Sequence, residues 1–142
     1  HRGIRTMPYL DIATGARLEY VDTDPAGSDR PVLIAIHGML GTARTHLGHV
    51  IDWLAPDYRV LGPSMRGYGQ SRPKPRDFPP DFYRRDTLDL LAFMDALGIE
   101  RAHVMGYSDG GEIALMAGGM APERCAGAST STPKRAAVWR TS

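Results

Sequence analysis

The chain has 142 residues, of which 42% are apolar and 23% are charged. These values are ordinary for one globular domain with a real hydrophobic core. Seventeen Lys and Arg residues are balanced by sixteen Asp and Glu residues, so the chain lacks the basic excess of proteins that bind nucleic acids or anionic membranes. The densest basic stretch, over 66–85, is interspersed with acids, and we interpret it as a solvated loop and helix face. We therefore expect neither a nucleic-acid partner nor a membrane partner.

Cysteine is rare and the histidines are scattered. The single cysteine, Cys125, cannot form a disulfide within one chain, which fits a reducing compartment and predicts a cytoplasmic location. His46, His49 and His103 show no ligand-like clustering, so we expect packing or surface roles for them and no metal site. The longest apolar runs are far too short to span a bilayer.

The predicted elements follow in chain order. Two short strands flank a turn at Thr14 and Gly15, and a polar loop leads to an apolar run over 32–37 that is typical of a strand buried on both faces. The patterns after it predict a helix from Leu47 to Leu54 ended by Pro56, a strand over 58–63, a long surface loop over 64–80, a helix over 83–97 closed by Gly98, a strand over 102–106, and a helix just past Ser108. Strands that alternate with helices predict a single α/β domain with a mostly parallel sheet and flanking helices.

A serine lies within a group of glycines at the end of the 102–106 strand. Gly106, Ser108 and Gly110 match the pattern G-x-S-x-G between a strand and a helix, and Gly111 follows. A strand that reverses sharply into a helix leaves no room for side chains two residues before and after the serine. The turn holds the serine in a strained conformation and directs its hydroxyl into a cleft. We interpret Ser108 as a nucleophile; the alternative is a glycine-rich turn with a solvent-facing serine.

The end of the 32–37 strand carries a second candidate feature, the segment His37-Gly38-Met39-Leu40-Gly41. In a nucleophile-elbow fold the loop after this strand supplies an N–H group to the oxyanion. Gly38 lets the loop pass close to the nucleophile, and the N–H of Met39 is the best candidate donor. The N–H of Asp109, at the start of the last helix, is the other donor. His37 precedes Ser108, whereas a hydrolase base follows the serine, so we interpret His37 as structural rather than as a base.

The segments "HGMLG", "SMRGYGQS" and "GYSDGG", in this order and spacing, resemble the α/β-hydrolase superfamily. Residues from Met65 to Leu115 look most like its valacyclovir-hydrolase (biphenyl-hydrolase-like) branch, and the resemblance covers residues 8–125. It implies a cofactor-free serine hydrolase that acts on small carboxylic esters or related acyl compounds through an acyl-enzyme. Ser108 matches the nucleophile of the family, and the N–H groups of Met39 and Asp109 match its oxyanion donors.

No histidine follows Ser108 in this chain, and Asp109, Glu112 and Glu123 are the only acids after it. None of these acids lies where a later strand would deliver the acid of a catalytic triad, so both the acid and the histidine are missing. A serine without a base is a poor nucleophile near neutral pH. We therefore expect a weakly active or inactive serine hydrolase. The alternative is a non-catalytic fold fragment or binding remnant, and within the enzyme class a perhydrolase or a C–C bond hydrolase.

The side chain of Asp109 begins one residue from the nucleophile. Its carboxylate can attract a cationic substrate such as an amino-acid ester. It can equally well do no more than complement the dipole of the helix that it begins. Both interpretations remain open from the sequence.

The two ends of the chain depart from the family pattern. We expect residues 1–125 to be the N-terminal part of one α/β-hydrolase domain, truncated after the elbow helix, and residues 126–142 to be an atypical tail, frame-shifted or disordered. Residues 1–6 precede the first methionine, and we interpret them as upstream read-through or added sequence. With no convincing strand after it, the 102–106 strand is expected to form an unpaired edge, which predicts marginal stability and self-association through Ala102, Val104 and Met105.

Overall fold

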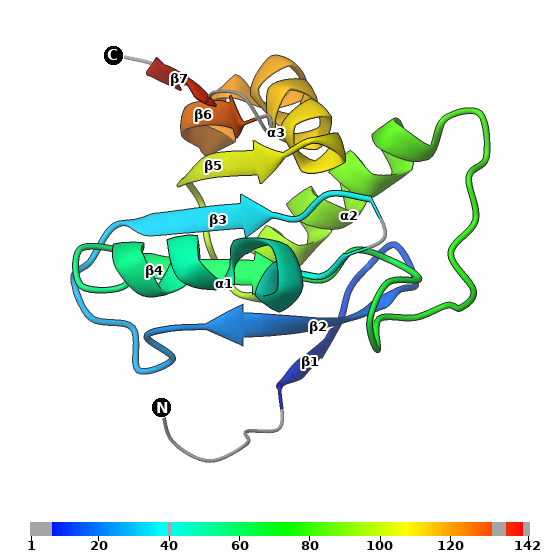
Figure 1. Ribbon diagram of the computed structural model, residues 1–142, viewed down its shortest axis with the longest axis horizontal. Coiled ribbons are helices and arrows are strands. Elements are labelled where there is room, and N and C mark those ends of the chain that lie inside the picture. Colours follow the sequence, from blue (N-terminus) through cyan, green and yellow to red (C-terminus); the bar gives the residue numbers. More distant parts are fainter. Residues whose placement is uncertain (1–6, 40, 132–135, 141–142) are drawn as a thin grey trace.

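A seven-stranded sheet forms the centre of the computed structural model, which describes residues 7–39, 41–131 and 136–140 (Figure 1). The order of the strands across the sheet is β1-β2-β4-β3-β5-β6-β7. Strands β4, β3, β5 and β6 run parallel to one another, and β1, β2 and β7 join antiparallel at the two sides. The strands span Tyr9–Asp11 (β1), Arg17–Asp22 (β2), Val32–Ile36 (β3), Arg59–Pro63 (β4), Ala102–Tyr107 (β5), Cys125–Ser131 (β6) and Ala136–Arg140 (β7).

Helices cover both faces of this sheet (Figure 1). They are α1 (Ala43–Leu54), α2 (Phe82–Ala96), α3 (Asp109–Met120) and a short 3-10 turn, η1 (Pro122–Arg124). Successive side chains of a strand point to opposite faces, and β3 shows this alternation. Ile34 and Ile36 pack with buried residues of α2 and α3, whereas Leu33 and Ala35 pack with buried residues of α1. The continuous apolar run of β3 is therefore explained by burial on both faces.

The predicted α/β class and the predicted elements up to α3 are confirmed, with boundaries that differ by a few residues. The opening hairpin turns at Gly15, which has a φ of 94° that favours glycine. Strand β5 lies beside β3, with Ile34 opposite Val104. All helices among the described residues are too short or too polar to cross a lipid bilayer.

The prediction of an unpaired edge at 102–106 is wrong. Strand β5 pairs with β3 on one side and with β6 on the other, from Ala102 opposite Cys125 to Tyr107 opposite Ser131. The segment Cys-Ala-Gly-Ala-Ser-Thr-Ser of β6 lacks the bulky apolar residues that mark a strand, but backbone pairing does not depend on them. Strands β1 and β7 form the outer edges instead. Self-association through β5 is therefore excluded, because both of its edges are paired within the chain.

Strand β7, and β6 from its second residue on, lie within residues 126–142. The sequence alone predicts a frame-shifted or disordered tail for that segment. The two strands pair with each other antiparallel, with Ser131 opposite Ala136. Residues 1–6, which we interpret as added sequence, lie outside the described residues.

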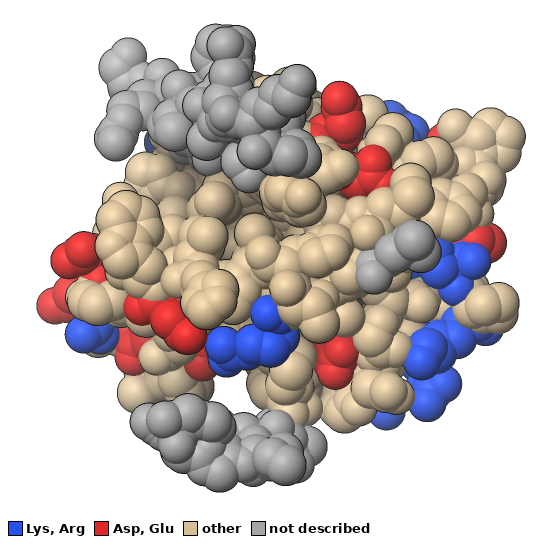
Figure 2. Space-filling view, in the orientation of Figure 1, with Lys and Arg blue, Asp and Glu red and all other residues tan. Residues whose placement is uncertain are grey.

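Part of the charged stretch that we interpret as solvated is buried, which corrects that interpretation. Arg72 and Lys74 are exposed as expected, and basic side chains gather in Figure 2 at the end of the molecule where Figure 1 places the 64–80 loop. In contrast, Arg76 donates two hydrogen bonds, of 2.9 and 2.6 Å, to the carboxylate of Asp86, and their side chains are only 8% and 2% exposed. The Arg76 guanidinium also lies 4.8 Å from the ring centre of Tyr68. This pair joins the long loop to α2.

We predict that Arg76→Met lowers the free energy of unfolding by about 3 to 5 kcal/mol, because it leaves the buried Asp86 carboxylate without its partner. The matched control is Arg44→Met, since Arg44 pairs with Asp52 at 3.5 Å with both side chains more than half exposed. Losing that exposed pair costs less than about 1 kcal/mol. Urea unfolding of both variants measures the difference. Equal losses would contradict the structural role of the buried pair.

Candidate active site

Ser108 occupies a sharp turn between the end of β5 and the start of α3. Its φ is 55° and its ψ is −114°, and no other non-glycine residue in the described ranges has a positive φ. Such a conformation costs on the order of 1 to 3 kcal/mol and persists only where the surroundings hold it. Gly111 N–H donates to the Ser108 carbonyl at 2.8 Å, which fixes the turn from the helix side. Ser108 itself is exposed, at the carboxyl end of a parallel strand, where α/β sheets place their ligands.

The glycines around Ser108 are required by close backbone approach. A Cβ at Gly106 would overlap the carbonyl of Gly110, and a Cβ at Gly110 would overlap the carbonyl of Ile36. A Cβ at Gly38 would lie 3.0 Å from the Tyr107 ring and 3.3 Å from the Cβ of Ser108. The absence of these three side chains lets the ends of β3 and β5 meet at the serine. The structure thus brings together the two segments that the sequence singled out.

The backbone N–H groups that the sequence predicts as oxyanion donors belong to Asp109 and Met39. Asp109 is the first residue of α3, and the first N–H groups of a helix have no partner within it. The N–H groups of Gly111 and Glu112 are taken by the Ser108 carbonyl, at 2.8 and 3.4 Å, and no described acceptor engages the Asp109 N–H. Met39 follows Gly38 in the loop beside Ser108, and its side chain is 44% exposed.

His37 is buried, and both of its ring nitrogens are occupied. Nδ1 lies 2.7 Å from the carbonyl of Gly38, and Nε2 lies 2.8 Å from the N–H of Met65. The carbonyl can only accept, so Nδ1 carries the proton and Nε2 accepts from Met65. Burial lowers the pKa of His37 to about 4, which keeps the ring neutral near pH 7. A neutral ring with no free lone pair cannot take a proton from Ser108, so this geometry favours the structural interpretation over the base.

The side chain of Asp109 has a partner that the sequence did not reveal. The hydroxyl of Tyr83, on the first turn of α2, donates to Asp109 Oδ1 at 2.7 Å. This hydrogen bond raises the pKa of Tyr83 to about 12, because a tyrosinate would face the carboxylate. Asp109 Oδ2 is buried and has no hydrogen-bond partner among the described residues. One oxygen of the carboxylate is therefore held by α2, and the other has no hydrogen-bond donor, in the residue directly after Ser108.

His46 is a second residue whose place the sequence did not reveal. Its Nδ1 accepts a hydrogen bond of 3.0 Å from the N–H of Gly38, and its ring centre lies 5.4 Å from that of Tyr107. The only signal in the sequence is its position one turn after "HGMLG". His103 is at the opposite end of β5, where its ring packs against Tyr58.

Comparison with known proteins places this geometry in a family. Residues 31–141 match the profile described as the alpha/beta hydrolase fold. The chain belongs to the α/β-hydrolase family. The resemblance inferred from its motifs is therefore confirmed.

The curated relatives of this α/β-hydrolase chain include hydrolases of more than one kind. Human serine hydrolase BPHL is 38% identical over 109 residues, which cover 76% of this chain and 36% of that protein. The epoxide hydrolase of Caballeronia sordidicola is 33% identical over 114 residues, which cover 80% of this chain and 33% of that protein. The chain thus spans about a third of the length of these relatives.

Solved structures support the same fold assignment. A structure titled as novel epoxide hydrolases of the alpha/beta hydrolases superfamily, from metagenomes of hot environments, superimposes with a TM-score of 0.78. It is 28% identical in sequence, and the match covers 92% of this chain and 43% of that one.

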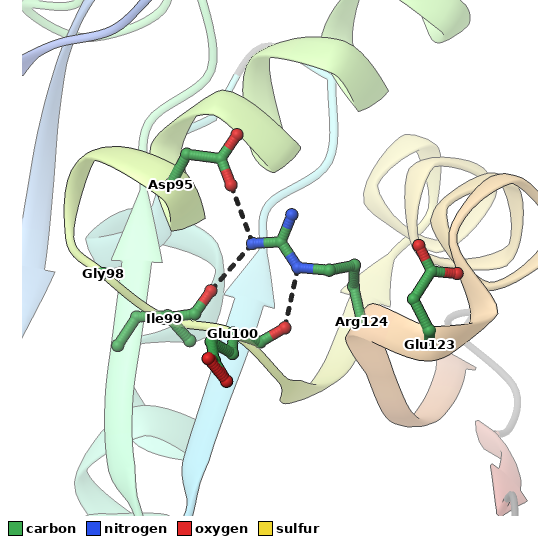
Figure 3. A pocket seen from close by; sticks show the side chains of 6 residues that line it. All are labelled: Asp95, Gly98, Ile99, Glu100, Glu123 and Arg124. Atoms are coloured by element: carbon green, nitrogen blue, oxygen red, sulfur yellow. Dashed lines mark hydrogen bonds and ion pairs between the residues drawn. The ribbon is translucent and has the colours of Figure 1, made fainter.

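A pocket of about 680 Å³ is lined by Asp95, Gly98, Ile99, Glu100, Glu123 and Arg124 (Figure 3). Its centre is Arg124, whose guanidinium donates to the carbonyls of Ile99 and Glu100, at 2.8 and 2.7 Å, and pairs with Asp95 at 2.9 Å. These bonds join η1 to the end of α2 and to the segment that follows it. Because β5 begins beside this pocket and ends at Ser108, the pocket is separate from the candidate active site.

No group of three or more His, Cys, Asp or Glu side chains in the described ranges could hold a metal ion. Cys125 is buried, and burial raises the pKa of its thiol. A buried thiol with a raised pKa is a poor nucleophile. Ser108 is therefore the best nucleophile candidate in the described part of the chain.

We predict that Gly106→Ala lowers the free energy of unfolding by about 3 kcal/mol, because its Cβ overlaps backbone atoms of the elbow that cannot move aside. The control is Gly119→Ala in the last turn of α3, where an added Cβ meets nothing within 4 Å. That change stabilises the helix by up to about 1 kcal/mol. Urea unfolding of the two variants measures whether each change lowers or raises the free energy of unfolding. A stable Gly106→Ala protein would contradict the steric account of the elbow.

Proposed function

We propose that this chain carries the nucleophile and oxyanion groups of a serine hydrolase site that acts on small carboxylic esters or related acyl compounds. The observation that carries the proposal is the strained Ser108, exposed at the carboxyl end of β5 with the N-terminus of α3 directly behind it. Membership of the α/β-hydrolase family and the similarity to a serine hydrolase support it.

In the proposed reaction Ser108 Oγ attacks the acyl carbon, and the carbonyl electrons move onto its oxygen. The N–H groups of Met39 and Asp109 donate to this oxyanion. The C–O bond to the alcohol then breaks, the alcohol leaves with a proton, and an acyl-Ser108 ester remains. Attack by water on the same carbon releases the acid and restores the hydroxyl.

The proton of Ser108 needs an acceptor, and this requirement limits the rate. The chain has no histidine after Ser108, and both ring nitrogens of His37 are occupied. A site that keeps its oxyanion donors but lacks the triad base loses several orders of magnitude in rate. We therefore propose slow acylation. The competing candidate is a non-catalytic binding remnant, which the same missing base favours.

Asp109 is proposed to give this site a preference for cationic acyl compounds. Its Oδ2 is buried and lacks a hydrogen-bond donor, so the carboxylate acts on an ammonium group of a substrate through the attraction between their charges. Tyr83 holds Oδ1 and thereby fixes the direction of the carboxylate. Glu112 lies in the same first turn of α3 but is exposed, so it can complement the helix dipole without contacting a bound substrate.

We predict that a fluorophosphonate probe labels Ser108 once per chain and slowly, and that p-nitrophenyl butyrate is turned over slowly. The probe forms the same bond as an acyl group and needs the same oxyanion donors. Mass spectrometry locates the label, and Ser108→Ala is the control. Absence of labelling would favour the binding remnant. Fast turnover that Ser108→Ala abolishes would show that a base acts on Ser108 after all.

We predict that Asp109→Asn lowers the ratio of labelling rates between a cationic aminoalkyl phosphonate and its neutral N-acetyl counterpart. A loss of about tenfold corresponds to 1.4 kcal/mol of attraction. The amide oxygen of Asn can still accept from Tyr83, so the contact with α2 is kept and only the charge is removed. The matched control is Glu112→Gln, which removes a charge from the same helix turn. Equal effects of the two variants would assign Asp109 to the helix dipole alone.

A further inference from the structure

The loop between β3 and α1 is organised by two histidine rings, one from each side. His37 directly follows β3, and His46 lies in the first turn of α1. The N-terminus of α1 is firmly defined, because Thr42 and Thr45 form a reciprocal pair of hydrogen bonds, of 2.8 and 3.2 Å, between side chain and backbone. The His46 N–H donates to the Thr42 carbonyl at 3.0 Å, so the ring projects from a fixed helical position.

The backbone of Gly38 is held at both of its polar groups. Its N–H donates to His46 Nδ1 at 3.0 Å, and its carbonyl accepts from His37 Nδ1 at 2.7 Å. Each peptide group is planar and trans, so the carbonyl of one residue points opposite to the N–H of the next. Fixing the Gly38 carbonyl therefore fixes the direction of the Met39 N–H. Fixing the Gly38 N–H orients the preceding peptide plane, and the two bonds together leave Gly38 little freedom.

The packing around the His46 ring matches this arrangement. A side chain at Gly41 would occupy the space of the ring, so the loop can wrap closely around it only with glycine there. The ring meets Tyr107 edge-on at an interplanar angle of 69°, and His37 at 62°. Tyr107 immediately precedes Ser108. The His46 ring therefore touches the loop of the candidate oxyanion donor and the residue before the nucleophile.

From these contacts we infer that His46 is a positioning residue, which acts through Gly38 to orient the Met39 N–H toward the oxyanion of an acyl group on Ser108. The inference rests on the proposed function, since it presumes that Met39 donates to that oxyanion. His46 must be neutral at Nδ1 to accept from Gly38, so its proton lies on Nε2. A residue that only packs in the core does not need a hydrogen-bond acceptor at the position of Nδ1. A substitution that keeps or removes this acceptor therefore tests the inference.

The test compares His46→Leu, which fills the space without an acceptor, with His46→Asn, whose amide oxygen can take the place of Nδ1. His49→Leu on the same helix is the matched control, because His49 is exposed. Two readouts are measured on each folded variant: hydrogen exchange of the Gly38 amide by NMR, and the labelling rate of Ser108 by a fluorophosphonate. Thermal unfolding confirms that each variant is folded.

We expect His46→Leu to increase exchange at Gly38 and to slow Ser108 labelling by about tenfold to a hundredfold, less than the 10² to 10³ lost when an oxyanion donor is removed outright. We expect His46→Asn to restore both toward the unsubstituted protein and His49→Leu to change neither. Unchanged labelling in His46→Leu, or unchanged exchange at Gly38, would overturn the inference. If the unsubstituted protein is labelled no faster than Ser108→Ala, the proposed function fails, and the exchange measurement still shows whether His46 holds Gly38.

Discussion

The site depends on one steric constraint, the close approach of three backbone segments at Ser108. The ends of β3 and β5 and the start of α3 meet where Gly38, Gly106 and Gly110 have no side chains. Only this arrangement lets Ser108 keep a φ of 55°, which a non-glycine residue rarely adopts. The strain is maintained by the sheet and the helix together, because β5 is paired on both sides and α3 packs on it through buried residues such as Ile113. The stability of the whole fold is therefore what keeps Ser108 exposed in this conformation.

Buried and half-buried polar groups then fix the loops that this backbone arrangement leaves free. His37 and His46 hold Gly38, and His37 also accepts from the N–H of Met65 at the start of the long loop. That loop is in turn joined to α2 by Arg76 and Asp86. Each of these groups would be costly to bury without its partner. These hydrogen bonds and this ion pair form only in the native arrangement. The same contacts therefore offset the desolvation of the polar groups and define one loop conformation around the site.

The sequence was sufficient for the features that depend on local pattern. The apolar run of β3 and the glycines around Ser108 each report a constraint that acts within a few residues. The missed features depend on side chains that meet only after folding. Tyr83 and Asp109 are 26 residues apart, and nothing in either neighbourhood indicates the other. The burial of Arg76 depends on an acid ten residues away on α2, and charge composition alone favoured solvent exposure. Strand β6 was missed because small and polar residues give no periodic signal, although their backbone pairs as well as any other.

The electrostatics of the α3 N-terminus connect the two proposed roles of Asp109, whose N–H would donate to an oxyanion and whose carboxylate would attract a cation. The positive end of the helix dipole favours negative charge, and Asp109 and Glu112 already supply two carboxylates there. The negative charge of these carboxylates opposes part of the stabilisation that the helix dipole would give to an oxyanion on a substrate. The hydrogen bond from Tyr83 draws part of the Asp109 charge toward α2, and the pKa of about 12 keeps Tyr83 a donor at any physiological pH. A cation on the substrate would neutralise the remaining charge at Oδ2. Such a cation would weaken this opposition to the oxyanion and so favour the transition state more than the ground state.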